Sequence, residues 1–236
     1  MSGTIGMIDL GRRRYGEVLE LQRRLCRQRM TGEISGDSLL LVEHEPVVTL
    51  GRGTRASSLP LSASELTARG LEVFDVERGG DVTLHAPGQL VGYPVLDLTG
   101  WRRDLHWYLR QLEEVLIRGL DRVGIVAERD PGRTGVWSAG RKIASIGIHV
   151  KQWVTFHGFA LNVTTDLSLF DLIVPCGLTG VTMTSVAREQ PALSDPWHAT
   201  RAAVITAFAE VFEREIREPS EASLPEIGVA EARSPR

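Results

Sequence analysis

The sequence predicts a single α+β domain whose sheet is mixed, largely antiparallel and flanked by helices. Apolar stretches rich in β-branched residues recur between residues 38 and 163, which is typical of strands. Long segments with helical spacing separate groups of these strands, without the regular strand–helix alternation of a parallel sheet. The 236 residues are 42% hydrophobic and 24% charged, so the chain can bury a substantial core without disulfides or metals.

Three segments carry apolar residues at helical intervals. They are residues 15–30, 104–124 and 195–215. Cys26 lies on the apolar side of the first segment, and we predict that it is a core residue. Asp104 and Asp195 stand where N-caps are expected, and Pro196 follows at a first helical position, which proline favours. Gly124 is placed to end the second helix.

Strands are expected in the segments between these helices. They are residues 38–44, 46–51, 81–98 and 135–163. Pro46 separates the first two, because proline cannot donate a hydrogen bond to a sheet. The third segment contains two strands joined at the sequence APGQ, and the fourth contains three strands with turns at AGRK and VKQW.

The small net charge and the spacing of the cysteines and histidines argue against several classes of protein. The formal net charge of −3 gives no reason to expect binding to nucleic acid or to an anionic membrane. The two cysteines are far apart and form no CxxC, so neither a disulfide nor a structural zinc site is expected. The histidines show no HExxH or other metal-binding spacing, and we predict no metal and no cofactor.

The chain is expected to be a cytoplasmic monomer. It has no apolar run long enough to span a membrane and no signal-peptide pattern at its start. Residues 1–216 are assigned to one catalytic domain. Residues 217–236 contain few apolar residues and are predicted to form a flexible tail.

The sequence RGGDVTLH runs from Arg78 to His85 and is a candidate binding segment. Adjacent glycines allow a ligand to approach the backbone, Arg78 can hold an anionic group, and His85 offers a ring nitrogen. The alternative is a simple turn followed by a histidine that bonds within the protein. No Gly-Lys-Ser/Thr follows, so the segment is not a phosphate-binding Walker loop.

Lys142 stands at the start of a predicted strand, in the sequence GRKIASIGI. Most lysines are solvated surface groups, which is the simpler interpretation. Here the strand that follows is apolar and contains small residues, over which a substrate chain can pass. Lys142 is therefore a candidate for a partly desolvated cleft.

Cys176 lies between Pro175 and Gly177, in the sequence LIVPCGLTG. A packed, inert thiol is the simpler interpretation for a cysteine. The proline and the glycine argue instead for a turn, which exposes the sulfur and the neighbouring backbone N–H groups. A thiol with a pKa of about 8.5 needs a nearby cation to become a thiolate at neutral pH, and Lys142 is the candidate. The thiolate would attack a carbonyl, and the N–H groups of Cys176 and Gly177 would stabilise the oxyanion.

Five stretches resemble, in order and spacing, the octanoyltransferases of lipoate synthesis. They read VEHEPVVTLGR, RGGDVTLHAPGQLVGYPVLDL, GRKIASIGIHV, FHGFALNV and PCGLTGVTMTSV. The similarity covers about residues 5–215 and implies a fold of the biotin/lipoate protein ligase type. Leu84 and Ala86 depart from the family pattern, which usually has tyrosine and glycine there, and this bears on the polarity of the acyl pocket.

The resemblance implies a two-step acyl transfer. An octanoyl or lipoyl group passes from the thioester of acyl carrier protein to Cys176, the cysteine of the family's PCG motif. It then passes to a lysine of a lipoyl domain, as in 2-oxoacid dehydrogenase E2 subunits, or of the glycine cleavage H protein. Lys142, the lysine of the GRKIAS motif, activates the cysteine. The arginines of the first helix, among them Arg23 and Arg24, are either a solvated face or a dock for the acidic carrier protein.

The resemblance also implies where the acyl chain is bound, because the family's acyl-binding segments map onto three parts of this chain. They are Arg78, Gly79, Gly80, Asp81, Val82, Thr83, Leu84 and His85, then Ser145, Ile146 and Gly147, and then Gly158, Phe159 and Ala160.

Three other functions stay open on the residues alone. An ATP-dependent lipoate or biotin ligase of the same fold would activate a free acid as its adenylate and would need no cysteine. A cysteine hydrolase would pair Cys176 with His85 or His157. An acyl-binding module without catalytic activity would leave Cys176 inert.

Overall fold

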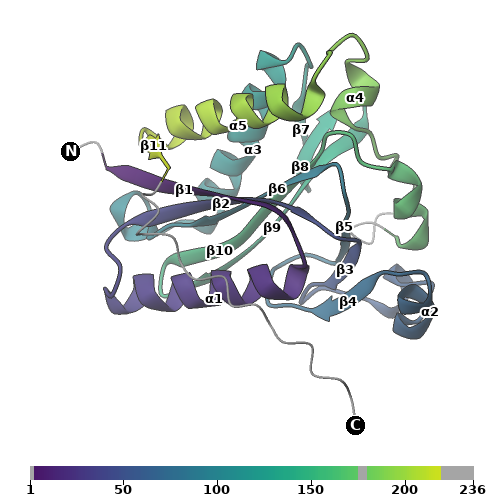
Figure 1. Ribbon diagram of the computed structural model, residues 1–236, viewed down its shortest axis with the longest axis horizontal. Coiled ribbons are helices and arrows are strands. Elements are labelled where there is room, and N and C mark those ends of the chain that lie inside the picture. The colour runs from purple at the N-terminus through teal and green to yellow at the C-terminus, as the bar shows by residue number, and fades with distance from the viewer. Residues whose placement is uncertain (1–2, 175–179, 219–236) are drawn as a thin grey trace.

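The computed structural model describes residues 3–174 and 180–218, which form two β-sheets and their surrounding helices (Figure 1). The helices are α1 (Tyr15–Thr31), α2 (Ala63–Ala68), α3 (Leu105–Arg122), α4 (Val186–Glu189) and α5 (Pro196–Phe212), with single 3₁₀ segments at Ala56–Ser58, Leu98–Gly100 and Leu167–Leu172. The large sheet consists of β1 (Thr4–Arg13), β2 (Asp37–His44), β6 (Gln89–Val95), β7 (Glu128–Asp130), β8 (Arg133–Ser138), β9 (Arg141–Lys151), β10 (Val154–Asn162) and β11 (Glu215–Arg217). The small sheet consists of β3 (Val47–Leu50), β4 (Glu72–Asp75) and β5 (Val82–His85).

The large sheet is mixed and largely antiparallel. Its strands follow the order β11-β1-β2-β6-β10-β9-β8-β7 in the described part of the chain. β1 pairs in parallel with β11 and with β2, and the remaining neighbours in this order pair antiparallel. The fold class predicted from the sequence is therefore confirmed.

The two faces of the large sheet pack against different helices (Figure 1). α3 and α5 cover one face, where Leu112, Leu116 and Phe208 are fully buried. α1 covers part of the opposite face, and its residues Leu21 and Cys26 are buried there. Cys26 is thus a core residue, as predicted. None of the described helices is both long enough and apolar enough to cross a membrane.

The ends of the long helices carry the signals that the sequence contains. The carboxylates of Asp104 and Asp195 each accept a hydrogen bond from a backbone N–H three residues later, and Pro196 is the first residue of α5. α1 ends at Thr31 and is capped by Gly32, whose φ of 75° is easily adopted only by glycine. Gly124, with φ of 79°, follows the C-cap of α3.

Strands that are adjacent in the sequence are divided between the two sheets. Pro46 separates β2 of the large sheet from β3 of the small sheet. Residues 86–88, the first three of the APGQ sequence, likewise separate β5 of the small sheet from β6 of the large one. The sequence patterns predict neither β1 nor the division of the strands into two sheets. The separation matters because it places β5 opposite the large sheet instead of beside it.

The small sheet has a core of its own, which contains Leu84. This residue is fully buried and packs in one cluster with Leu66 of α2 and Phe170 of the last 3₁₀ segment. Neighbouring residues of a strand point to opposite faces, so Leu84 faces away from its neighbours Thr83 and His85. Its side chain therefore serves the core of the small sheet.

We expect Leu84→Ala to lower the free energy of unfolding by about 2–5 kcal/mol, because it leaves a cavity in a packed core. Urea unfolding followed by circular dichroism would measure the change. Leu105→Ala is the matched control, since Leu105 is 43% exposed, and we expect it to change stability by less than about 0.5 kcal/mol. Equal effects of the two substitutions would contradict the packing described here.

Candidate functional site

A cavity of about 240 Å³ is lined by residues from both sheets and from α1. Pockets that take drug-sized ligands span roughly 300–1,000 Å³, so this cavity suits a slender ligand. The residues named from the sequence that line it are Arg78, Gly80, Asp81, Val82, Thr83, His85, Lys142, Ser145, Ile146, Gly147, His157, Gly158, Phe159 and Ala160. The lining residues that no sequence pattern singled out are Tyr15, Tyr93, Gly132, Arg133 and Thr134.

Two of the expected residues, Gly79 and Leu84, do not line the cavity. Leu84 belongs to the core of the small sheet, so its departure from the family pattern does not alter the polarity of this cavity. Gly79 lies in the loop that crosses β9, where its N–H donates to Ile148 O at 2.8 Å. Its contribution is to attach that loop to the sheet.

The side chain of Arg78 holds this loop in place. Its guanidinium donates to Thr49 O at 2.6 Å, to Thr49 Oγ1 at 2.9 Å, to Gly79 O at 3.1 Å and to Asp81 O at 2.7 Å. These contacts show that Arg78 shapes the wall of the cavity, which it also lines. Its contact with a substrate anion stays a prediction. A Cβ at Gly147 would lie only 3.0 Å from Arg78 Cδ and 3.2 Å from Gly79 O, so a glycine on β9 makes room for the loop.

Lys142 reaches the cavity because β9 contains an extra residue. The residues of β9 that pack on the α3 and α5 side are Ala144, Ile146, Ile148 and Val150. The two-residue period of a strand would put Lys142 in the same series. However, Val136 of β8 pairs with Ala144, whereas the next residue, Trp137, pairs with Lys142, which leaves Ile143 as a bulge. The bulge turns Lys142 to the cavity side, where it is 1% exposed.

His157 on β10 reaches the same side by a different break in alternation. Phe159 and Leu161 of this strand point into the core under α3 and α5. His157 has a φ of 58°, which is rare for a residue with a side chain. The His157 ring consequently stacks on Phe156, with the ring centroids 4.8 Å apart. The backbone N–H of His157 donates to Gln22 Oε1 of α1 at 2.8 Å. Such backbone strain is often found at functional sites.

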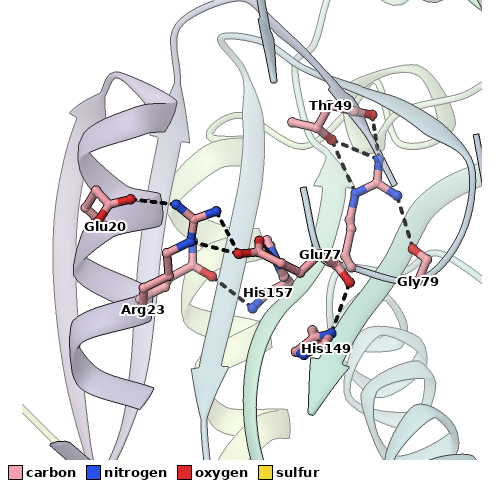
Figure 2. Close-up of polar contacts among 9 residues, drawn as sticks. Glu20, Arg23, Thr49, Glu77, Gly79, His149 and His157 are labelled. Carbon is pink, nitrogen blue, oxygen red and sulfur yellow. Dashed lines mark hydrogen bonds and ion pairs between the residues drawn. The ribbon is translucent and has the colours of Figure 1, made fainter. Parts of the chain in front are cut away.

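Glu77 connects α1 to the cavity (Figure 2). Arg23 Nε donates to Glu77 Oε1 at 2.9 Å, and Arg23 also pairs with Glu20 at 2.6 Å. Glu77 Oε2 lies 3.6 Å from His157 Nε2, and Glu77 O contacts His149 Nδ1 at 3.0 Å. The charge of Arg23 is thus engaged within the protein, which weakens the hypothesis that this arginine docks an acidic partner.

A chain of hydrogen bonds connects His85 to Lys142. His85 Nδ1 donates to Gln89 Oε1 at 2.7 Å, and Gln89 Nε2 donates to Asn162 Oδ1 at 2.9 Å. Asn162 Nδ2 then donates to Thr184 O at 3.0 Å, and Thr184 N donates to Lys142 O at 2.9 Å. Burial lowers the pKa of His85 to about 3, with His44 as a further cause. The ring is therefore neutral at physiological pH and keeps a lone pair on Nε2.

Cys176 lies outside the described residues, as do its neighbours from 175 to 179. The chain before this segment is anchored beside the cavity, because Val174 N donates to Ser58 O at 2.9 Å and Ser58 Oγ donates to Asp81 Oδ2 at 2.6 Å. The chain after it is anchored to Lys142, whose N–H donates to Thr182 O at 2.9 Å. Among residues 3–174 and 180–218, no group of three or more histidine, cysteine, aspartate or glutamate side chains is placed to hold a metal.

We expect acid to destabilise the fold through three buried histidines. Burial lowers the pKa of His44 to about 4 and that of His85 and His157 to about 3. An unfolded histidine titrates near pH 6.5, so the unfolded chain binds more protons below that value and stability falls as the pH drops. Each histidine contributes at most about 1.4 kcal/mol per pH unit between about 6.5 and its folded pKa. Urea midpoints measured between about pH 7.5 and 4.5 would test this, and a flat profile would contradict it.

The chain resembles known proteins over most of its length. The lipoyl protein ligase A/B catalytic domain family matches residues 14–213. An octanoyltransferase of Gloeobacter violaceus is 48% identical over 210 residues, which cover 89% of this chain and 91% of the relative. An octanoyltransferase of Solibacter usitatus is 53% identical over 171 residues, covering 72% of this chain and 77% of the relative.

The solved structure of a lipoate-protein ligase A bound with ATP has the same fold, with a TM-score of 0.72 and 16% identity over 96% of this chain and 91% of that one. At that identity the likeness concerns the fold alone. The family match and the curated relatives confirm the resemblance that the sequence motifs indicated. The chain therefore belongs to the lipoyl protein ligase A/B catalytic domain family and, within it, to the octanoyltransferases of lipoate biosynthesis.

Proposed function

We propose that this chain transfers an octanoyl group in two steps through a thioester on Cys176. The donor is the thioester of acyl carrier protein. The acceptor is the ε-amine of a lysine on a lipoyl domain, as in 2-oxoacid dehydrogenase E2 subunits, or on the glycine cleavage H protein. Lys142 activates Cys176, and the reaction takes place in the cytoplasm with a monomeric enzyme and without a cofactor.

The position of Lys142 is the observation that carries the proposal. It is 1% exposed, yet it lines the cavity, and both its N–H and its C=O are bonded to the segment that follows Cys176, at Thr182 and Thr184. Five residues lie between Cys176 and Thr182, a length of chain that lets the sulfur approach the ammonium group. An ammonium group close to a thiol favours the thiolate, which is the nucleophilic form.

The floor of the cavity suits an acyl chain. Gly147 and Gly158 are directly paired on β9 and β10, and Ala160 pairs with Ser145 beside them. The space at the two glycines is taken up by neighbouring chain, by the loop at Arg78 and Gly79 over Gly147 and by Gly92 against Gly158. The small side chains of Ser145 and Ala160, which line the cavity, leave the space for methylene groups. Each buried methylene contributes about 0.8 kcal/mol, which favours an eight-carbon chain over an acetyl group.

The proton on Lys142 balances both steps. In the first, the Cys176 thiolate forms a C–S bond to the donor carbonyl, the donor's C–S bond breaks, and its sulfur takes a proton from Lys142. In the second, the acceptor amine forms a C–N bond to the same carbonyl and the bond to Cys176 breaks. The amine proton returns to Lys142, which restores the starting state.

Hydrolysis by a cysteine–histidine pair is less consistent with the site. A general base works best when its pKa is near the working pH. Burial lowers the pKa of both His85 and His157 to about 3, with His44 acting further on His85 and Arg78 on His157. Neither ring is therefore a strong base at neutral pH.

We expect Cys176→Ala to abolish both acyl-enzyme formation and transfer. Intact-mass spectrometry after mixing the enzyme with octanoyl-acyl carrier protein, without ATP, would detect an octanoyl adduct on the wild type only. Cys26→Ala is the matched control, because Cys26 is a buried core thiol, and the adduct should persist in it. Full activity in Cys176→Ala would refute the covalent step. An absolute requirement for ATP would favour a ligase instead.

We expect Lys142→Ala to move the iodoacetamide alkylation profile of Cys176 to higher pH, because the thiolate loses its cation. The chain has just one other lysine, Lys151, which is exposed at the far end of β9. Lys151→Ala is therefore the control for loss of a positive charge. Superimposable profiles for the wild type and Lys142→Ala would remove Lys142 from the mechanism.

A further inference from the structure

We infer that Trp137 is a positioning residue, which holds the ammonium group of Lys142 in the cavity against the face of its indole ring. The inference rests on the proposed function, which gives Lys142 its role in acyl transfer. It goes further, because it names one group that keeps a long and flexible side chain in place.

The contact between the two residues is direct. Lys142 Nζ lies 5.1 Å from the centroid of the Trp137 ring, within the distance of about 6 Å at which a cation is attracted to an aromatic face. The two residues are cross-strand partners at the point where β8 and β9 change register. Trp137 is 2% exposed and Lys142 is 1% exposed, so little water screens the attraction.

Gly135 forms the other side of this pocket. A Cβ at position 135 would lie 2.9 Å from Lys142 Cε, 3.4 Å from Lys142 Nζ and 2.7 Å from Ala144 O. Gly135 also has a φ of 128°, which residues with a side chain rarely adopt. The end of the lysine side chain therefore lies between a glycine backbone and an indole face, two residues apart on β8.

Glu113 of α3 fixes the backbone at this glycine. Its carboxylate is fully buried, and Glu113 Oε1 accepts a hydrogen bond from Gly135 N at 3.2 Å. Arg110 Nη1 at 2.6 Å and Arg129 Nε at 3.1 Å pair with the other carboxylate oxygen. A buried carboxylate with two arginines is a rigid support, because each of its oxygens is engaged.

A second cation approaches the same ring. The guanidinium carbon of Arg133 lies 5.4 Å from the centroid of Trp137. Arg133 also forms an ion pair with Asp130 and is 41% exposed at its side chain. Arg133 is thus partly exposed and paired with a carboxylate at the edge of the cavity. Both cations can feel a change in the indole ring. A test of the inference must therefore observe Lys142 itself.

Positioning matters because a lysine side chain has four rotatable bonds to its amine. Burying such a side chain in one conformation costs it most of its rotamer freedom. A proton carrier is effective only when it stays within hydrogen-bond reach of the reacting atoms. The indole face compensates for part of that loss while leaving the N–H groups of the ammonium available to partners, since it offers no competing lone pair.

The presence of only two lysines allows a direct test by NMR. In protein labelled with ¹³C-lysine, the ring current of Trp137 should shift the Cε protons of Lys142 upfield, and those of Lys151 should be unshifted. Trp137→Leu should return the Lys142 signal to the ordinary position. An ordinary Lys142 shift in the wild type would overturn the inference, and so would a displaced shift that persists in Trp137→Leu.

A second experiment keeps the shape of the side chain, since Trp137→Leu could disturb folding. Site-specific incorporation of mono-, di- and trifluorotryptophan at position 137 withdraws charge from the ring face. We expect kcat for octanoyl transfer to fall stepwise, by about 2- to 30-fold in total, the equivalent of a cation–π interaction. KM for the acceptor domain should be unchanged. The same series at Trp101, which faces Arg214 at 4.5 Å, is the control and should not affect kcat.

The outcomes separate the inference from the proposed function. If Lys142→Ala abolishes transfer and the fluorinated series at position 137 leaves kcat constant, the positioning role of Trp137 is wrong while the dyad stands. If the wild type forms no octanoyl adduct at all, the proposed function fails, and the NMR experiment still decides whether Trp137 holds Lys142.

Discussion

Side-chain alternation along the large sheet is the constraint on which the site depends. One face of the sheet is closed by α3 and α5, so a polar side chain that follows the regular period of β9 or β10 would be buried in hydrocarbon. The extra residue at Ile143 turns Lys142 away from that core, and the positive φ of His157 does the same on the neighbouring strand. Both interruptions cost regular sheet structure, and both bring a titratable group to the cavity.

The cavity lies between the two sheets. The small sheet and its loops face the part of the large sheet that α1 leaves uncovered. The loop at residues 77–81 crosses β9 and is held there by backbone hydrogen bonds and by the guanidinium of Arg78. Gly147 permits the crossing, since any Cβ would meet the loop. A glycine pattern that reads in sequence as space for a ligand is thus partly space for the protein's own backbone.

Buried polar groups around the cavity are held in a defined protonation state. His44 donates from Nδ1 to Arg13 O and accepts from the hydroxyl of Tyr93, while burial keeps its ring neutral. His85 is neutral for the same reason and is connected through Gln89 and Asn162 to the backbone at Lys142. The neutral rings of His44 and His85 therefore add no positive charge beside the cavity at neutral pH.

The sequence alone determined the elements that obey local rules. The three long helices follow from their apolar spacing and from caps such as Asp104 and Asp195. Arg78, the glycines after it and His85 were identified from residue type, whereas Ser145 to Gly147 followed from the resemblance to a known family. The consecutive apolar residues Ile143 and Ala144 in GRKIASIGI gained a meaning only from the strand pairing, which shows that Ile143 is a bulge.

Only the tertiary structure decided which strands share a sheet and which side chains meet. Leu84 and Thr83 were both expected to bind the acyl chain. In the structure Leu84 lies in the core of the small sheet, whereas Thr83 lines the cavity. Tyr15, Tyr93 and Trp137 resemble ordinary core aromatics until strands distant in sequence bring them beside the cavity or beside Lys142. The physical reason is that burial and periodicity are local properties, whereas a site depends on the register between strands and on the layer to which each strand is added.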